Sequence, residues 1–126
     1  MPRKILIIDD DEPVRSALRS RFEGEGFEVI TAENGCQGLG AAKQENPNLI
    51  ILDLAMPDID GLAVLDDLRN DIITWDIPVV VLSARADPES QERSRQLGVR
   101  RFFQKPLSPR ILARAIKDLL NGIATQ

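Results

Sequence analysis

The sequence predicts an α/β fold: a doubly wound, five-stranded parallel sheet with helices on both faces. Five short apolar runs recur along the chain, and segments with helical periodicity separate them. Because these runs are apolar without alternation, each strand is expected to be buried on both faces, as in parallel sheets sandwiched by helices. The expected strands are Ile5–Ile8, Val29–Thr31, Leu49–Leu52, Val79–Leu82 and Phe102–Phe103.

Three amphipathic segments predict the first three helices. In the first, Val14, Leu18 and Phe22 recur at four-residue spacing behind Pro13, a residue favoured at the start of a helix. Gly24 and Gly26 are expected to end this helix. The second helix is expected from about Asn34 to Gln44, and the third from about Gly61 to Arg69 with Leu62, Leu65 and Leu68 on one face.

The last two helices differ in their apolar content. The final one covers 108–120, with Ser108 as its cap and Pro109 at its first position. Its expected buried residues are Ile111, Leu112, Ala115, Ile116, Leu119 and Leu120. The fourth helix, within Pro88–Leu97, has no large apolar residue before Leu97, so we expect it to be weakly anchored.

Length and composition fit one globular domain. The 126 residues suffice for a single core, and we expect one domain over 1–126 with an ordered core at about 3–121. No apolar run approaches the ~20 residues of a membrane span and no signal-peptide pattern follows Met1, so a cytoplasmic protein without a membrane partner is expected. Cys36 is the only cysteine, which excludes an internal disulfide, and we expect it to be inert packing.

The absence of histidine narrows the possible chemistry. It excludes Ser-His-Asp and Cys-His nucleophiles, zinc sites built on histidine and phosphohistidine, leaving carboxylates, hydroxyls and lysine. The net charge of −4 is unevenly distributed, because residues 1–83 hold 7 basic and 16 acidic residues and residues 84–126 hold 9 basic and 4 acidic residues. The second part is therefore a candidate partner surface.

Polar side chains gather where the expected strands end. Asp9 and Asp10 follow the first strand, and Asp53 follows the third. Ser83 and Lys105 follow the fourth and fifth. Because ligands of open parallel sheets bind beyond the carboxyl ends of the strands, these side chains are expected to converge. Two carboxylates about 5 Å apart repel by roughly 3 kcal/mol at an effective dielectric of about 20, a cost that a hard cation such as Mg²⁺ would offset.

Asp53 is the candidate nucleophile. It ends a buried strand and precedes the turn with Met56 and Pro57, where a carboxylate can form an acyl phosphate. The metal would bridge Asp53 to the incoming phosphoryl group, Lys105 would neutralise an equatorial oxygen and Ser83 would donate a hydrogen bond. The neighbouring acids Asp11 and Glu12 fit a capping role at the first helix instead.

Four stretches in order closely resemble the response regulator receiver domain of two-component signalling, the CheY-like family. They are ILIIDDDEPVR, ILDLAMPDIDGL, IPVVVLSARAD and GVRRFFQKPLSP, and the match spans nearly the whole chain. The resemblance implies a flavodoxin-like strand order 2-1-3-4-5. It also implies a phosphorelay protein that receives its phosphoryl group from a sensor histidine kinase or phosphotransfer protein and controls a downstream effector or output domain.

The resemblance implies a role for each site residue. These roles are phosphorylation at Asp53, direct metal binding by Asp10, metal binding mainly through water by Asp9, metal binding by the backbone carbonyl of Ala55, switching by Ser83 and Phe102, and phosphate binding by Lys105. The implied cofactor is Mg²⁺, with Mn²⁺ able to substitute. The family is a phospho-accepting signalling domain rather than an enzyme, able to catalyse its own phosphorylation and dephosphorylation. The implied switching face is formed by the fourth helix, fifth strand and fifth helix.

Three departures from the family pattern affect these expectations. Phe102 stands where the family most often has tyrosine, so its burial would be driven by apolar area alone. Ala55 carries only a methyl group and is expected to leave the approach to Asp53 open to water. Arg100 and Arg101 give the last strand a basic start, which we expect to influence partner choice.

Two other functions remain open from the sequence. One is a phosphatase of the haloacid-dehalogenase type, because Asp9 and Asp11 mimic its paired aspartates with Asp9 as nucleophile; against it, Glu12 and Pro13 depart from that pattern and no cap insertion exists. The other is a degenerate receiver that acts only as a binding module. A flavodoxin-type FMN protein is disfavoured because the chain has no tyrosine. Direct nucleic-acid binding is not expected, since no helix-turn-helix or basic-aromatic pattern appears.

Overall fold

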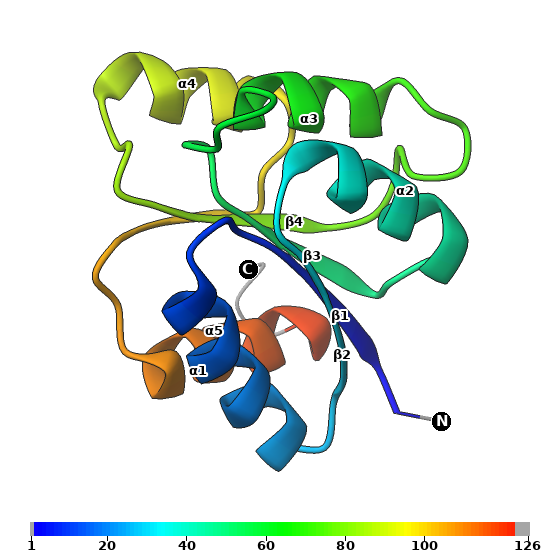
Figure 1. The fold of residues 1–126 in the computed structure, drawn as a ribbon, viewed down its shortest axis with the longest axis vertical. Coiled ribbons are helices and arrows are strands. Elements are labelled where there is room, and N and C mark those ends of the chain that lie inside the picture. The colour runs from blue at the N-terminus through cyan, green and yellow to red at the C-terminus, as the bar shows by residue number, and fades with distance from the viewer. Residues whose placement is uncertain (1, 123–126) are drawn as a thin grey trace.

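The computed structural model describes residues 2–122, which form three layers (Figure 1). A twisted parallel sheet lies in the middle; α1 and α5 cover one face, and α2, α3 and α4 cover the other. The strands are β1 (Lys4–Ile8), β2 (Glu28–Ala32), β3 (Leu49–Leu52), β4 (Val79–Ser83) and β5 (Arg101–Gln104). All neighbouring pairs are parallel, in the order β2-β1-β3-β4-β5. The doubly wound fold and its implied strand order are confirmed.

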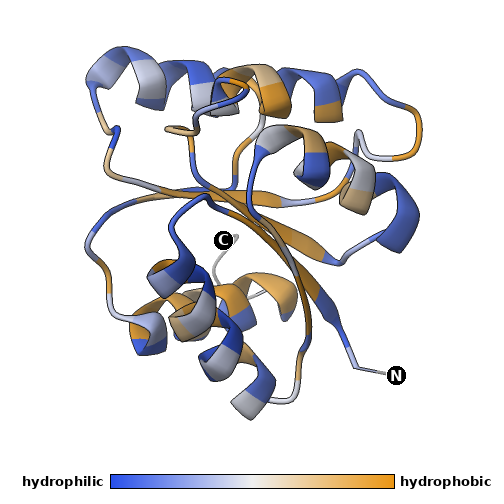
Figure 2. Ribbon diagram, in the orientation of Figure 1, coloured by the Kyte–Doolittle hydropathy of each residue, from blue (hydrophilic) through white to orange (hydrophobic). Residues whose placement is uncertain are grey.

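The sheet separates two apolar clusters. Ile5 and Ile7 of β1 face α1 and α5, while Leu6 and Ile8 face α2 and α3. These four side chains are fully buried, because successive residues of a strand point to opposite faces and both faces are covered. Figure 2 shows this as a band of hydrophobic colour running through the central strands. Apolar runs without alternation are what such a sheet requires.

All five helices, including α1 behind its expected start at Pro13, lie within one residue of their expected bounds. They are α1 (Glu12–Gly24), α2 (Gly35–Glu45), α3 (Gly61–Arg69), α4 (Pro88–Gln96) and α5 (Pro109–Leu120). Four of them begin behind a residue whose side chain accepts a hydrogen bond from a backbone N–H of the first turn. For α2 to α5 these capping residues are Asn34, Asp60, Asp87 and Ser108. Asp11 occupies the same position before α1 without a side-chain cap bond. Local capping therefore sets most helix starts.

Some expectations about burial are wrong. The strand β5 is not buried on both faces, because it lies at the edge of the sheet and its two phenylalanines are only half-buried. Ile111 is 48% exposed, because the buried stripe of α5 is centred on Leu112 and Ile116 and extends to Ala113 on the side away from Ile111. At about 100° per residue, Ile111 falls at the edge of that stripe. Cys36 is exposed rather than packed, since it lies in the first turn of α2 on the solvent side. No helix among the described residues has the length and apolarity needed to cross a membrane.

Candidate functional site

Three carboxylates meet at the carboxyl edge of the sheet. Asp9, Asp10 and Asp53 each offer one oxygen, and these oxygens lie within 4.8 Å of one another. Asp9 and Asp53 are only 3% and 4% exposed, whereas Asp10 is exposed to solvent. Because β1 and β3 are neighbours in register, with Ile8 opposite Leu52, the residues that follow them arrive together. The structure thus brings the three acidic residues expected at this edge into one cluster.

Lys105 joins this cluster from the end of β5. Its ammonium lies 2.9 Å from Asp9 Oδ2 and 3.1 Å from Asp53 Oδ2. Its backbone N–H donates to the carbonyl of Ser83 at 3.0 Å, and the following peptide bond to Pro106 is cis. Burial alone would lower the pKa of Lys105, but the hydrogen bonds and charges of Asp9 and then Asp53 raise it above its usual value. The lysine is therefore held protonated between two acids.

One lysine does not neutralise the cluster. Burial raises the pKa of Asp9, and the charge of Asp53 raises it further. The backbone N–H of Asp11, which donates to Asp9 Oδ1 at 2.9 Å, and the ammonium of Lys105 oppose these effects without reversing them. Oxygen ligands with excess negative charge are the donor set that Mg²⁺ prefers, so these residues fit such an ion.

The loop between β3 and α3 is fixed on both sides of the site. Asp53 Oδ1 accepts the backbone N–H of Ala55 at 3.1 Å, and Gly61 N–H donates to the carbonyl of Leu54 at 2.8 Å. A Cβ at position 61 would lie 2.3 Å from Leu54 Cα, so only glycine allows α3 to begin this close to the site. This requirement for glycine at position 61 was not predicted from the sequence.

Asp58 ties the same loop to α2. Its two carboxylate oxygens accept the backbone N–H groups of Gly35 and Cys36, each at 3.0 Å. These two bonds lower the pKa of Asp58 to about 2. This contact could not be predicted from the sequence, since Asp58 and Gly35 lie 23 residues apart and Asp58 resembles an ordinary turn residue.

Ser83 lies at the end of β4 and is fully buried. Its hydroxyl oxygen accepts the backbone N–H of Arg85 at 3.1 Å. The guanidinium of Arg85 then reaches two further elements, donating to Asp60 at 2.8 Å and to the Ser90 hydroxyl at 3.0 Å. Arg85 therefore connects the end of β4, the start of α3 and the start of α4. Sequence reasoning missed it, and only its position two residues after Ser83 could have drawn attention to it.

Phe102 and Arg101 lie on the edge strand β5, and Arg100 directly precedes it. Phe102 is half-buried and packs against the cluster shared with α2 and α3. Arg100 and Arg101 are exposed, and the Arg101 guanidinium lies 4.8 Å from the centre of the Phe103 ring. Ala55 is exposed beside Asp53 and adds no bulk there. Trp75 precedes β4 and is 57% exposed, so it lies at the opposite edge of the sheet from the carboxylates.

Comparison with known families gives a match over most of the chain. Residues 5–117 match the family described as the response regulator receiver domain. The chain belongs to this family. A receiver domain is a signalling domain of two-component phosphorelays, and its members work with histidine kinases and output domains. The assignment favours the receiver interpretation over the haloacid-dehalogenase-type alternative.

Several relatives are about twice as long as the segment that matches this chain. The receiver domain is 37% identical over 120 residues to a probable transcriptional regulator, ycf27, of Porphyridium aerugineum, covering 95% of this chain and 49% of the relative. It is 34% identical over 120 residues to the alkaline phosphatase synthesis transcriptional regulatory protein PhoP of Bacillus subtilis, covering 95% and 49%. The chain thus spans about half the length of these relatives.

Other matches are single-domain in length. The polar-differentiation response regulator DivK of Brucella anthropi is 33% identical over 120 residues, covering 95% of this chain and 98% of the relative. A CheY-like receiver domain structure from Methanospirillum hungatei superposes with a TM-score of 0.92 at 28% identity, covering 98% of this chain and 97% of that one. Over its described residues, this receiver domain therefore has the fold of a known receiver.

Proposed function

We propose that this receiver domain accepts a phosphoryl group on Asp53 from a sensor histidine kinase or phosphotransfer protein. The observation that carries the proposal is the convergence of Asp9, Asp10, Asp53 and Lys105 in one cluster. Three carboxylates around one lysine repel one another and destabilise the fold when no ligand is bound. A bound cation and a phosphoryl group would account for this costly arrangement. Each residue then has one of the roles that phosphoryl transfer needs.

The proposed metal ligands are Asp9, Asp10, Asp53 and the backbone carbonyl of Ala55. Mg²⁺, or Mn²⁺ in its place, would supply positive charge between the Asp53 carboxylate and the oxygens of the phosphoryl group. Asp10, the exposed member of the cluster, can reach an ion from the solvent side, while buried Asp9 is held by the backbone N–H of Asp11. Burial raises the pKa of Asp9 and the charge of Asp53 raises it further, so a cation beside these carboxylates would stabilise their charged forms.

In the transfer step an Asp53 carboxylate oxygen attacks phosphorus. A new oxygen–phosphorus bond forms while the bond from phosphorus to the donor histidine nitrogen breaks, and the imidazole leaves with the electron pair. Lys105, now bound to Asp53 Oδ2, would turn to an oxygen of the phosphoryl group. The exposed methyl of Ala55 leaves room for water, which would later hydrolyse the acyl phosphate and return the free aspartate.

The proposed output is a change in the face formed by α4, β5 and α5. A phosphoryl group adds nearly two negative charges beside the hydroxyl of Ser83, which would turn to donate to it. Movement of Ser83 would vacate space that Phe102, half-buried on the adjacent strand, can enter. The resulting shift in population would alter the affinity of this face for an effector or output domain.

Labelling with a small phosphodonor such as acetyl phosphate tests the acceptor. The wild type should incorporate phosphate when Mg²⁺ is present and lose incorporation when Mg²⁺ is chelated. Asp53→Asn should abolish labelling. Asp58→Asn is the matched control, because it removes the same charge from the same loop outside the cluster and should still be labelled.

Three results would contradict the proposal. Labelling that persists in Asp53→Asn excludes Asp53 as the acceptor. Phosphate mapped to Asp9 would support a haloacid-dehalogenase-type phosphatase, and a wild type that is never labelled would support a receiver used only as a binding module.

A further inference from the structure

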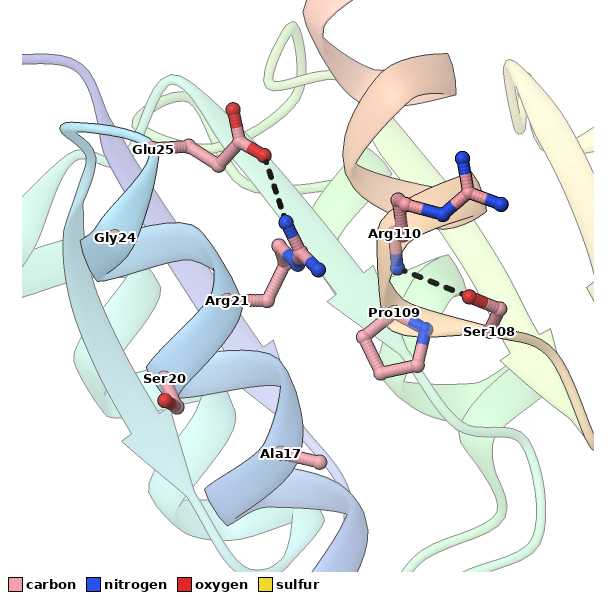
Figure 3. A pocket seen from close by; sticks show the side chains of 8 residues that line it. All are labelled: Ala17, Ser20, Arg21, Gly24, Glu25, Ser108, Pro109 and Arg110. Carbon is pink, nitrogen blue, oxygen red and sulfur yellow. Dashed lines mark hydrogen bonds and ion pairs between the residues drawn. The ribbon is translucent and has the colours of Figure 1, made fainter.

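A basic groove runs between α1 and α5, away from the carboxylate cluster. One hollow of about 540 Å³ is lined by both helices and contains Arg21, Glu25 and Arg110 (Figure 3). A second hollow of about 440 Å³ shares these three residues and adds Ile111, Arg114 and Lys117. The lining of the second hollow holds four basic residues and one acidic residue, Glu25. This is a local charge of +3 on a chain whose net charge is −4.

The basic residues of this groove are not balanced within the described part of the chain. Glu25 accepts from Lys117 at 2.8 Å and from Arg21 at 3.3 Å, so it is shared by two cations. The side chains of Arg110 and Arg114 form no ion pair with any residue from 2 to 122. Two cations are therefore available to a ligand.

The placement of these arginines is unfavourable to the isolated helix. Arg110 lies in the first turn of α5, where the helix dipole disfavours positive charge. Arg110 and Arg114 are also four residues apart on one face, where like charges repel. Ile111, exposed between them, adds apolar surface to the same face. Helix stability does not explain this combination, whereas binding of an acidic, partly apolar ligand does.

We propose that the α1–α5 groove docks an acidic segment of a partner protein, with carboxylates at Arg110 and Arg114 and an apolar side chain against Ile111. Glu25 already shows how a carboxylate is held here, because the Lys117 ammonium and then Arg21 hold the pKa of its carboxyl below the usual value. The docking does not depend on phosphorylation of Asp53. It gives this receiver a second contact surface beside its proposed switching face.

A second copy of the chain is a poor occupant. In a two-fold symmetric pair the same patch meets itself, so Arg110 and Arg114 of one copy would face the same arginines of the other. Like charges across an interface are unfavourable. Charge complementarity instead selects a different chain that carries the negative charges.

Peptide titration monitored by amide chemical shifts tests the proposal. The probe is a synthetic peptide, Glu-Glu-Leu-Glu-Glu-Leu-Glu, added at low salt to the full chain. Shifts should concentrate in the second half of α1 and along α5. Arg110→Glu with Arg114→Glu should weaken binding by about tenfold or more, because two attractive pairs become repulsive. Replacing the leucines of the peptide by serine should also weaken binding.

The matched control is Arg100→Glu with Arg101→Glu, which makes the same change of charge on the exposed start of β5. It should reduce affinity by less than about twofold if the α1–α5 groove is the site. The proposal is overturned if the peptide does not bind, if shifts centre on 88–102, or if both double variants lose affinity equally. It is also overturned if the serine peptide binds as well as the leucine peptide, or if sedimentation shows a dimer that Arg110→Glu with Arg114→Glu dissociates. None of these outcomes depends on phosphate labelling of Asp53.

Discussion

The helices α4 and α5 flank the same edge strand but are attached to the domain in different ways. The buried residues of α5 are Leu112, Ala113, Ile116 and Leu119, whereas those of α4 are Ser90 and Ser94. Burying one leucine or isoleucine side chain stabilises a fold by about 1.5–3 kcal/mol. Apolar burial therefore anchors α5 by several kcal/mol and contributes little within α4.

Polar contacts take the place of apolar burial in α4. Ser94 donates back to the carbonyl of Ser90 within the helix, and Ser90 accepts from the guanidinium of Arg85 outside it. Arg85 in turn leads to Ser83 and Asp60 at the edge of the carboxylate cluster. A change at the carboxylate cluster can therefore shift α4 at a low cost in free energy, whereas α5 is held in place by its apolar contacts.

The largest expected effect comes from truncating the core of α5. Ile116→Ala removes a fully buried side chain and should lower the free energy of unfolding by about 2–5 kcal/mol. Ser94→Ala in α4 removes one hydrogen bond to a neighbouring carbonyl and should cost no more than about 1.5 kcal/mol. Urea denaturation of both variants measures the difference. Equal losses would show that α4 is as firmly anchored as α5.

A smaller and more local effect is expected at Arg85. Arg85→Ala breaks the links to Asp60 and Ser90, so α4 should open more often, with amide exchange faster by about fivefold. Exchange in α5 should not change. Arg95→Ala is the control, because its ion pair with Glu92 lies wholly within α4 and leaves Arg85 in place. If Arg95→Ala accelerates exchange as much, Arg85 is not the tether.

The contrast between the two helices was readable from the sequence, because it depends on periodicity. The segment Pro88–Gln96 has no large apolar residue, and α5 has an apolar stripe. The carboxylate cluster was also readable, since strand ends of a parallel sheet converge whatever their side chains. The excess of basic residues in 84–126, which favours a partner surface there, follows directly from the amino-acid composition.

The parts that were not predicted depend on contacts between distant segments. Arg85 and Asp58 act through partners on other elements. Apart from the nearness of Arg85 to Ser83, nothing in their sequence neighbourhood distinguishes them from ordinary loop residues. Ile111 was wrongly predicted to be buried, because the apolar periodicity of α5 does not show which flank of its stripe packs against the domain. The structure buries the flank that carries Ala113 and leaves Ile111 exposed. Periodicity gives the face of a helix but not the limits of its contact.

The smallest expected effect is a difference between α4 and α5 in how the stability of their first turns depends on pH. The cap of α4 is Asp87, whose pKa is lowered by hydrogen bonds from the Ser90 hydroxyl and backbone N–H, whereas α5 is capped by Ser108, which does not titrate. Because the folded-state pKa lies below the unfolded value of 3.8, this stabilisation is complete above about pH 4 and is lost as the pH falls through the folded-state pKa. Acidification below pH 4 should therefore lower the protection factors for amide exchange, which are corrected for the intrinsic rate at each pH, in the first turn of α4 before those of α5. Asp87→Asn keeps an acceptor without the titration and should remove the pH dependence of α4 alone; a pH response that persists in this variant would assign the loss to another carboxylate.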